Sequence, residues 1–153
     1  KYFILTIQKY KNLNEYNLFN YFSNITVSLT DNYPTISNDK GNPISKLRLE
    51  LNGNNRFNYL EGNYFNYVQP YECFNNTPND GVNCYSFALN PMKIQPSGTC
   101  NFSKIDKASL KIHLNNDFLD LLSSDEYIYI SVYAVNYNIL RFNKGLCGLG
   151  FNF

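Results

Sequence analysis

The side chains that could act as nucleophiles share a single possible base. The hydroxyls of Ser97 and Ser103 and the thiols of four cysteines would each need a neighbouring base, yet His113 is the only histidine in the chain. His113 stands between Ile112 and Leu114 in a run typical of a β-strand. That setting favours a structural or surface histidine, so these residues do not indicate an enzyme.

The densest group of carboxylates falls within and just after the one segment that could form a short helix, residues 116–123. Apolar residues interrupt the group. We therefore expect the acids to cap that helix and solvate a loop rather than to exchange protons with a substrate. The acids are Asp117, Asp120, Asp125 and Glu126.

Residues 95–106 carry donors that could bind an anion, but they lack the spacing and the Gly-Lys pair of a phosphate loop. Backbone geometry explains the segment better. Pro96 fixes φ and Gly98 can close a tight turn over residues 95–98. Ser103, followed three residues later by Asp106, resembles the cap of a short helical turn. The possible anion donors are Ser97, Gly98, Thr99 and Asn101.

The four cysteines do not form a recognisable metal site. None is spaced as Cys-x-x-Cys, and the single histidine lies far from any pair of them, which argues against zinc. A metal-bearing jelly-roll enzyme would need several histidine or carboxylate ligands. We expect no cofactor and free, mostly buried thiols, with a disulfide among the first three as the alternative in a secreted protein. The cysteines are Cys73, Cys84, Cys100 and Cys147.

Three asparagines match the glycosylation acceptor pattern Asn-x-Ser/Thr. About one residue in six is asparagine, so such matches arise by chance, and an A/T-rich genome would produce the same bias. They are weak candidates for modification. The three are Asn24, Asn75 and Asn101.

Length and composition indicate one folded domain spanning residues 1–153. Apolar residues make up 44% and charged residues 16%, which is a composition typical of folded proteins. The net charge of +1 lacks the basic excess of a dedicated nucleic-acid binder. No run is long enough to insert in a membrane, and no signal peptide is recognisable. Because Lys1 already stands in a strand-like pattern, we expect a longer parent polypeptide.

The elements that must position these side chains are short β-strands. Leu47, Leu49 and Leu51 alternate with charged residues, which predicts one face in the core and one in water. Asn52 and Gly53, with the two asparagines after them, predict a hairpin turn. Strands are expected over residues 2–8, 25–30, 46–51, 56–60, 83–89, 109–114 and 127–138, with both faces of the last one covered and with loops at 31–43 and 77–81.

This spacing predicts an all-β fold: a jelly-roll sandwich of two antiparallel sheets with short helical turns in its loops. The chain contains 14 tyrosines and 12 phenylalanines, which suit pleated surfaces. Aromatic side chains left exposed could form contacts between subunits. They could equally stack on sugars, so a carbohydrate-binding jelly roll is the alternative function.

Four sequence blocks occur in order and resemble the major capsid proteins of nucleocytoplasmic large DNA viruses. They are residues 65–71 (FNYVQPY), 85–91 (YSFALNP), 95–106 (QPSGTCNFSKID) and 132–141 (VYAVNYNILR), the last followed by a Gly-rich end. The motif positions that we expect to be structurally important are Gln69, Pro70, Gln95, Pro96, Ser97, Gly98, Asn101, Ser103, Asp106, Asn136, Tyr137, Asn138 and Arg141.

The resemblance implies a subunit of two consecutive jelly rolls, of which this chain would be the second, C-terminal one. Three such subunits would form a homotrimeric, pseudo-hexagonal capsomer of a virion shell that assembles in the host cytoplasm. The implied partners are further copies of the protein, neighbouring capsomers and minor capsid proteins. Neither direct nucleic-acid contact nor membrane insertion is implied.

Overall fold

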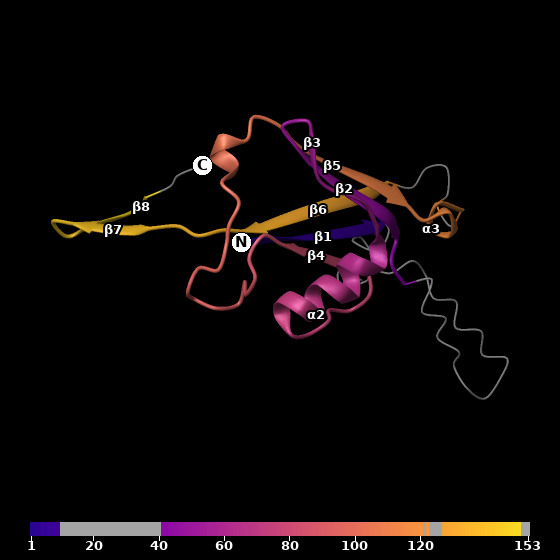
Figure 1. Ribbon diagram of the computed structural model, residues 1–153, viewed down its shortest axis with the longest axis horizontal. Coiled ribbons are helices and arrows are strands. Elements are labelled where there is room, and N and C mark those ends of the chain that lie inside the picture. Colours follow the sequence, from indigo (N-terminus) through magenta and orange to yellow (C-terminus); the bar gives the residue numbers. More distant parts are fainter. Residues whose placement is uncertain (10–40, 121, 123–126, 151–153) are drawn as a thin grey trace.

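The computed structural model describes residues 1–9, 41–120, 122 and 127–150, and these residues form mainly antiparallel strands (Figure 1). One sheet has the order β4-β1-β6, and a second has the order β3-β2-β5. A separate ribbon pairs β7 with β8. The strand bounds are β1 Tyr2–Lys9, β2 Ile44–Leu51, β3 Asn54–Glu61, β4 Val82–Ser86, β5 Ala108–Leu114, β6 Ile128–Val135, β7 Leu140–Asn143 and β8 Leu146–Leu149.

The core lies between the central strands of the two three-stranded sheets. Leu5 and Ile7 of β1 and Leu47 of β2 are almost completely buried, and they form one apolar cluster with Phe65 and Phe118. Burying each such side chain stabilises the fold by about 2 kcal/mol. The period-two alternation in the sequence therefore gives the sandwich its inner faces, as predicted.

The hairpin between β2 and β3 confirms the predicted turn. Asn52 and Gly53 have φ values of 51° and 79°, the positive values of a two-residue turn that matches strand twist. Asn54 and Asn55, expected in the turn, instead begin β3 and pair with Leu51 and Glu50 respectively.

Most of the other predicted strands are confirmed with altered ends. The predicted strand 25–30 lies outside the described residues. Strand β4 ends at Ser86 and β6 at Val135, three residues earlier than expected in each case. The prediction that both faces of β6 are covered is wrong, because Ile130 and Tyr133 on opposite faces are both more than half exposed. Among the described elements, β6 lies at a sheet edge.

A helical segment at residues 64–74 was not predicted. A π-helical turn, η2 (Tyr64–Val68), continues into the α-helix α2 (Gln69–Phe74), which packs beside β4 (Figure 1). Its aromatic and β-branched residues favour strands by propensity, so the sequence signal was misleading. The predicted helix at 116–123 is confirmed over α3 (Asn116–Asp120), which buries Phe118, and residues 121 and 123 lie outside the described residues.

Candidate functional site

The first motif block, residues 65–71, contains Asn66, whose buried side-chain amide bonds to the loop before β4. Asn66 is 0% exposed. Its Oδ1 accepts the N–H of Gly81 at 2.8 Å, and its Nδ2 donates to the carbonyl oxygen of Asn79 at 3.4 Å. The π-helical turn therefore holds the loop before β4 through one side chain that satisfies polar backbone groups.

Two further buried asparagines, Asn42 and Asn83, bond to each other next to this contact. The Nδ2 of Asn42 donates to Oδ1 of Asn83 at 2.8 Å, and the Nδ2 of Asn83 returns a bond to Oδ1 of Asn42 at 3.2 Å. Asn42 Oδ1 also accepts the N–H of Ile44 at 3.1 Å. Sequence reasoning assigned asparagine to turns and missed these buried roles, because residue type alone does not distinguish a buried amide from an exposed one.

Gln69 joins the first two motif blocks. Its Oε1 accepts the N–H of Ser86 at 3.2 Å, and its Nε2 donates to the hydroxyl of Tyr64 at 3.2 Å. Pro70, which is also buried, lies in the first turn of α2. The two motif residues therefore fix the helix against the end of β4.

The third block closes the long loop after β4, although not by the predicted turn. The Oγ of Ser97 accepts the N–H of Asn90 at 2.8 Å. The tight turn lies at residues 90–93, where the N–H of Lys93 donates to the carbonyl of Asn90, rather than at residues 95–98. Proline at the second position favours either turn, and Pro91 rather than Pro96 takes that place. Gln95 and Pro96 lie in the exposed loop.

Glycine is required at position 98 by its backbone conformation and by a close contact, and not by the predicted turn. Its φ is 136°, and a Cβ there would lie 2.9 Å from the carbonyl oxygen of Phe87. Glycine adopts this backbone conformation without the steric cost that other residues meet. The position therefore needs glycine for a close approach of two segments.

The helical turn η3 (Phe102–Lys104) is capped differently from the prediction. The Oδ1 of Asn101 accepts the N–H of Ser103 at 3.1 Å, so Asn101 is the cap and Ser103 lies inside the turn. Asparagine is as good a cap as serine, which is why the sequence did not separate them. Asp106 is exposed beyond the turn.

The fourth block forms a linker between β6 and β7. Asn136 and Asn138 each accept the N–H of the residue that follows, at 2.8 Å. The half-buried ring of Tyr137 lies under the Nζ of Lys1, 4.3 Å from the ring centroid. Arg141 is exposed in β7. These motif residues hold the linker locally and mark the place where the chain leaves the sandwich.

The groups that could do chemistry are placed apart in the described part of the chain. The ring of His113 packs edge-on against Tyr59, with 4.8 Å between centroids. Burial raises the pKa of the Cys84 thiol to about 11 and also raises the pKa of Cys73, which disfavours the nucleophilic thiolate. The described residues contain no group of three or more metal-ligating side chains, and no helix among them is long and apolar enough to cross a membrane.

The prediction of free, mostly buried thiols agrees only in part with the structure. All four cysteines are free, but only Cys84 is fully buried and Cys147 is exposed. Asn75 and Asn101 are exposed, whereas Asn24 lies outside the described residues. Their modification stays a prediction.

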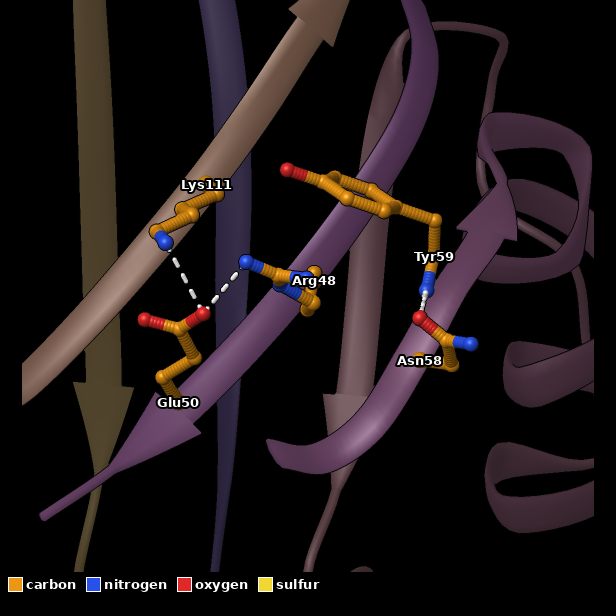
Figure 2. Close-up of polar contacts among 5 residues, drawn as sticks. All are labelled: Arg48, Glu50, Asn58, Tyr59 and Lys111. Carbon is orange, nitrogen blue, oxygen red and sulfur yellow. Dashed lines mark hydrogen bonds and ion pairs between the residues drawn. The ribbon is translucent and has the colours of Figure 1, made fainter. Parts of the chain in front are cut away.

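The outer face of sheet β3-β2-β5 carries a charged cluster (Figure 2). Glu50 pairs with Arg48 at 2.5 Å and with Lys111 at 2.9 Å. The hydrogen bond from Lys111, followed by the charge of Arg48, lowers the pKa of Glu50. Arg48 also lies over the ring of Tyr59, 4.5 Å from its centroid. The charged groups of the cluster therefore pair chiefly with one another, although Nε of Arg48 is buried without a hydrogen-bond partner among the described residues.

Between the sheets, a cleft of about 460 Å³ opens near Lys1. Both sheets contribute to its lining, which is chiefly apolar, with Lys1, Tyr2 and Cys100 as its titratable side chains. Its apolar lining includes Phe3, Leu49, Phe87, Phe102, Leu110 and Val132.

Several of the most exposed apolar side chains lie in two segments, the loop after β4 and the β7–β8 ribbon. In the loop after β4, Leu89, Met92 and Ile94 are 78%, 69% and 94% exposed. In the β7–β8 ribbon, Phe142 and Leu146 are similarly exposed. Scattered apolar residues need no explanation, but groups of them on projecting segments are typical of interaction surfaces.

Comparison with known proteins agrees with this geometry. A family model described as large eukaryotic DNA virus major capsid protein matches residues 1–148. The major capsid protein of Phaeocystis pouchetii virus is 47% identical over 111 residues, covering 72% of this chain and 21% of that protein. The major capsid protein of Paramecium bursaria Chlorella virus 1 is 38% identical over 123 residues, covering 71% of this chain and 28% of that protein.

A solved structure supports the same relationship. A quasi-atomic model of the PBCV-1 virus capsid superposes with a TM-score of 0.69 and 28% identity, covering 99% of this chain and 43% of that chain. The fold is therefore the all-β jelly roll of viral capsid proteins. The alignments span less than a third of the length of the two curated relatives. The chain belongs to the family of major capsid proteins of large eukaryotic DNA viruses.

Proposed function

We propose that residues 1–153 form one jelly-roll domain, the C-terminal part of a longer double jelly-roll subunit that builds the virion shell. Family membership supports the structural role. The similarity covers 43% of the solved capsid chain, which is the share expected of one of two comparable domains. The proposed subunit self-assembles as a homotrimer with a pseudo-hexagonal outline.

The observation that carries the proposal is the exposed apolar surface of the loop after β4. Leu89, Met92 and Ile94 bury little of their surface in the chain itself. Specific protein interfaces bury about 800 Å² on each partner, and projecting apolar segments provide such area. A shell subunit needs this kind of surface, because weak contacts are multiplied by symmetry.

The proposed partners are other copies of the subunit, neighbouring capsomers and minor capsid proteins. Turnover is not part of the proposed role, and neither is direct contact with nucleic acid, since the net charge is +1. Assembly in the host cytoplasm is consistent with four free thiols, because that compartment keeps thiols reduced.

The oligomeric mass of the full-length protein tests this function. Size exclusion with light scattering should give a trimer, and Ile94→Glu in the exposed loop should weaken it more than the matched control Lys93→Glu. Both residues are exposed in the same loop, so the pair separates apolar burial from added charge. A stable monomer whose melting temperature rises with a glycan would contradict the proposal and favour the carbohydrate-binding alternative.

A further inference from the structure

The β7–β8 ribbon has one apolar face and one face on which the polar residues Arg141 and Asn143 lie beside Leu146 and Gly148. Residues directly opposite in an antiparallel pair share a face, and successive residues alternate. Leu140 pairs with Leu149 and Phe142 with Cys147, so these four side chains share one face. The other face carries Arg141, Asn143, Leu146 and Gly148.

The ribbon is well formed but poorly covered. Its turn uses Lys144 and Gly145 with φ values of 49° and 79°, and the N–H of Gly150 bonds to the carbonyl of Ile139 at its base. The strands contact chiefly each other and project from the end of β6 (Figure 1). A two-stranded hairpin is marginally stable in water by itself, so its apolar face needs a partner.

The root of this arm lies beside Lys1. The carbonyl of Lys1 accepts the N–H of Phe87 at 2.8 Å, its Nζ donates to the carbonyl of Pro91 at 3.3 Å, and the same Nζ lies over the Tyr137 ring. In a longer subunit, the polypeptide that precedes Lys1 therefore passes the point where the arm leaves the sandwich.

We infer that the apolar face of the β7–β8 arm docks on the preceding domain of the same subunit and clasps the two domains together. The inference rests on the proposed function, because it requires a subunit that continues before Lys1. The alignments leave more than two thirds of each curated relative outside this chain, so there is ample polypeptide to receive the arm.

Tethering favours this occupant over a second copy of the chain. A domain joined by a short linker acts at an effective concentration in the millimolar range, whereas another subunit must first be recruited from solution. Docking of the four apolar side chains would then precede oligomer formation. The polar face, with Arg141 and Asn143, would stay in water.

Thiol labelling of the full-length protein tests the docked face, because Cys147 lies on it. The matched control is Asn143→Cys combined with Cys147→Ser, which moves the thiol to the opposite face of the same ribbon. Peptide mass spectrometry reads each thiol separately. We expect alkylation of Cys147 to be on the order of ten-fold slower than alkylation of the control thiol, since docking limits access. Equal rates at the two positions, fast or slow, would overturn the inference.

A photo-crosslinking amino acid incorporated at position 147 during translation identifies the occupant, because it requires no access of a reagent to the docked thiol. Products that keep the mass of one subunit and join the arm to sequence before Lys1 support the inference. Products with the mass of two subunits would assign the arm to a neighbouring copy and overturn it. Light scattering on the protein used for thiol labelling separates the two proposals. A trimer with a freely reactive Cys147 refutes only the clasp, and a monomer with a protected Cys147 refutes only the trimer.

Discussion

The side chains of the amide network near β4 find their contacts inside the domain, whereas those of the terminal β7–β8 ribbon are largely exposed. Asn66 is completely enclosed and bonds to two backbone groups of its own chain. Phe142 is three-quarters exposed and contacts little beyond its own ribbon. The comparison separates residues that the domain needs in order to fold from residues that it presents to something else.

A pair of glycines should give the largest difference between the two regions. A Cβ at Gly62 would overlap the carbonyl oxygen of Ile44, whereas no atom of the described residues lies within 4 Å of a Cβ at Gly148. We expect Gly62→Ala to lower the free energy of unfolding by about 3 kcal/mol, and Gly148→Ala to change it by less than about 0.5 kcal/mol. Urea unfolding followed by circular dichroism measures both. Similar losses for the two variants would remove the distinction between the regions.

Asparagines provide the next comparison. Asn66→Ala leaves the N–H of Gly81 without its partner, and we expect a loss of about 2 kcal/mol in the free energy of unfolding. Asn143→Ala, on the exposed polar face of the ribbon, should stay within about 0.5 kcal/mol of the original protein. The same denaturation experiment tests the pair, and a neutral Asn66→Ala would show that the network is not required for stability.

Alkaline pH should destabilise the buried region first. Burial raises the pKa of Cys84 from its ordinary value of 9.0 to about 11, so the folded state holds its proton more tightly than the unfolded state. The stabilisation that the protonated Cys84 thiol contributes to the folded state is complete below pH 9 and is lost as the pH rises from 9 to 11. Cys84→Ala should flatten this part of the stability profile, and Cys147→Ala on the exposed ribbon should leave it unchanged. Urea midpoints between pH 8 and pH 11 measure the effect.

The charged surface cluster should show the smallest effect, at the acidic end. The hydrogen bond from Lys111 lowers the pKa of Glu50 from its ordinary value of 4.5. The stabilisation is therefore present above pH 4.5 and is lost as the pH falls through the lowered pKa. Glu50→Gln should flatten the melting-temperature profile below pH 4.5, and Lys111→Met should add nothing in that background. Additive losses would show that the two residues act independently.

Regular patterns in the sequence predicted most of the sandwich. Alternating leucines predicted β2, and Asn52 with Gly53 predicted its turn, because these signals depend only on local geometry. The family motifs marked segments that we expect to matter, but they did not predict how these segments act. Gln69 joins a helix to β4, a contact between residues far apart in sequence that no local pattern encodes.

The errors also have physical causes. The helix at 64–74 contains tyrosine, phenylalanine and valine, which favour strands, and buried amide contacts with distant residues help to hold it in place. The terminal ribbon was read as part of a Gly-rich tail. Lys144 and Gly145 have nearly the same positive φ values as Asn52 and Gly53, but lysine is not one of the residues that signal such a turn in a sequence. Exposed strands also lack the alternation with a core that would have supported a hairpin prediction.

The ring of Tyr85 has a consequence for motion within the sandwich. Its centroid lies 4.9 Å from that of Phe57, 5.0 Å from Phe87, 5.5 Å from Phe3 and 6.3 Å from Phe65. These neighbours belong to strands of both sheets, to the helical segment and to the loop, so a half-turn of the ring requires all of them to separate briefly. The ring-flip rate of Tyr85, measured by NMR line shapes, therefore reports how often the two sheets move apart.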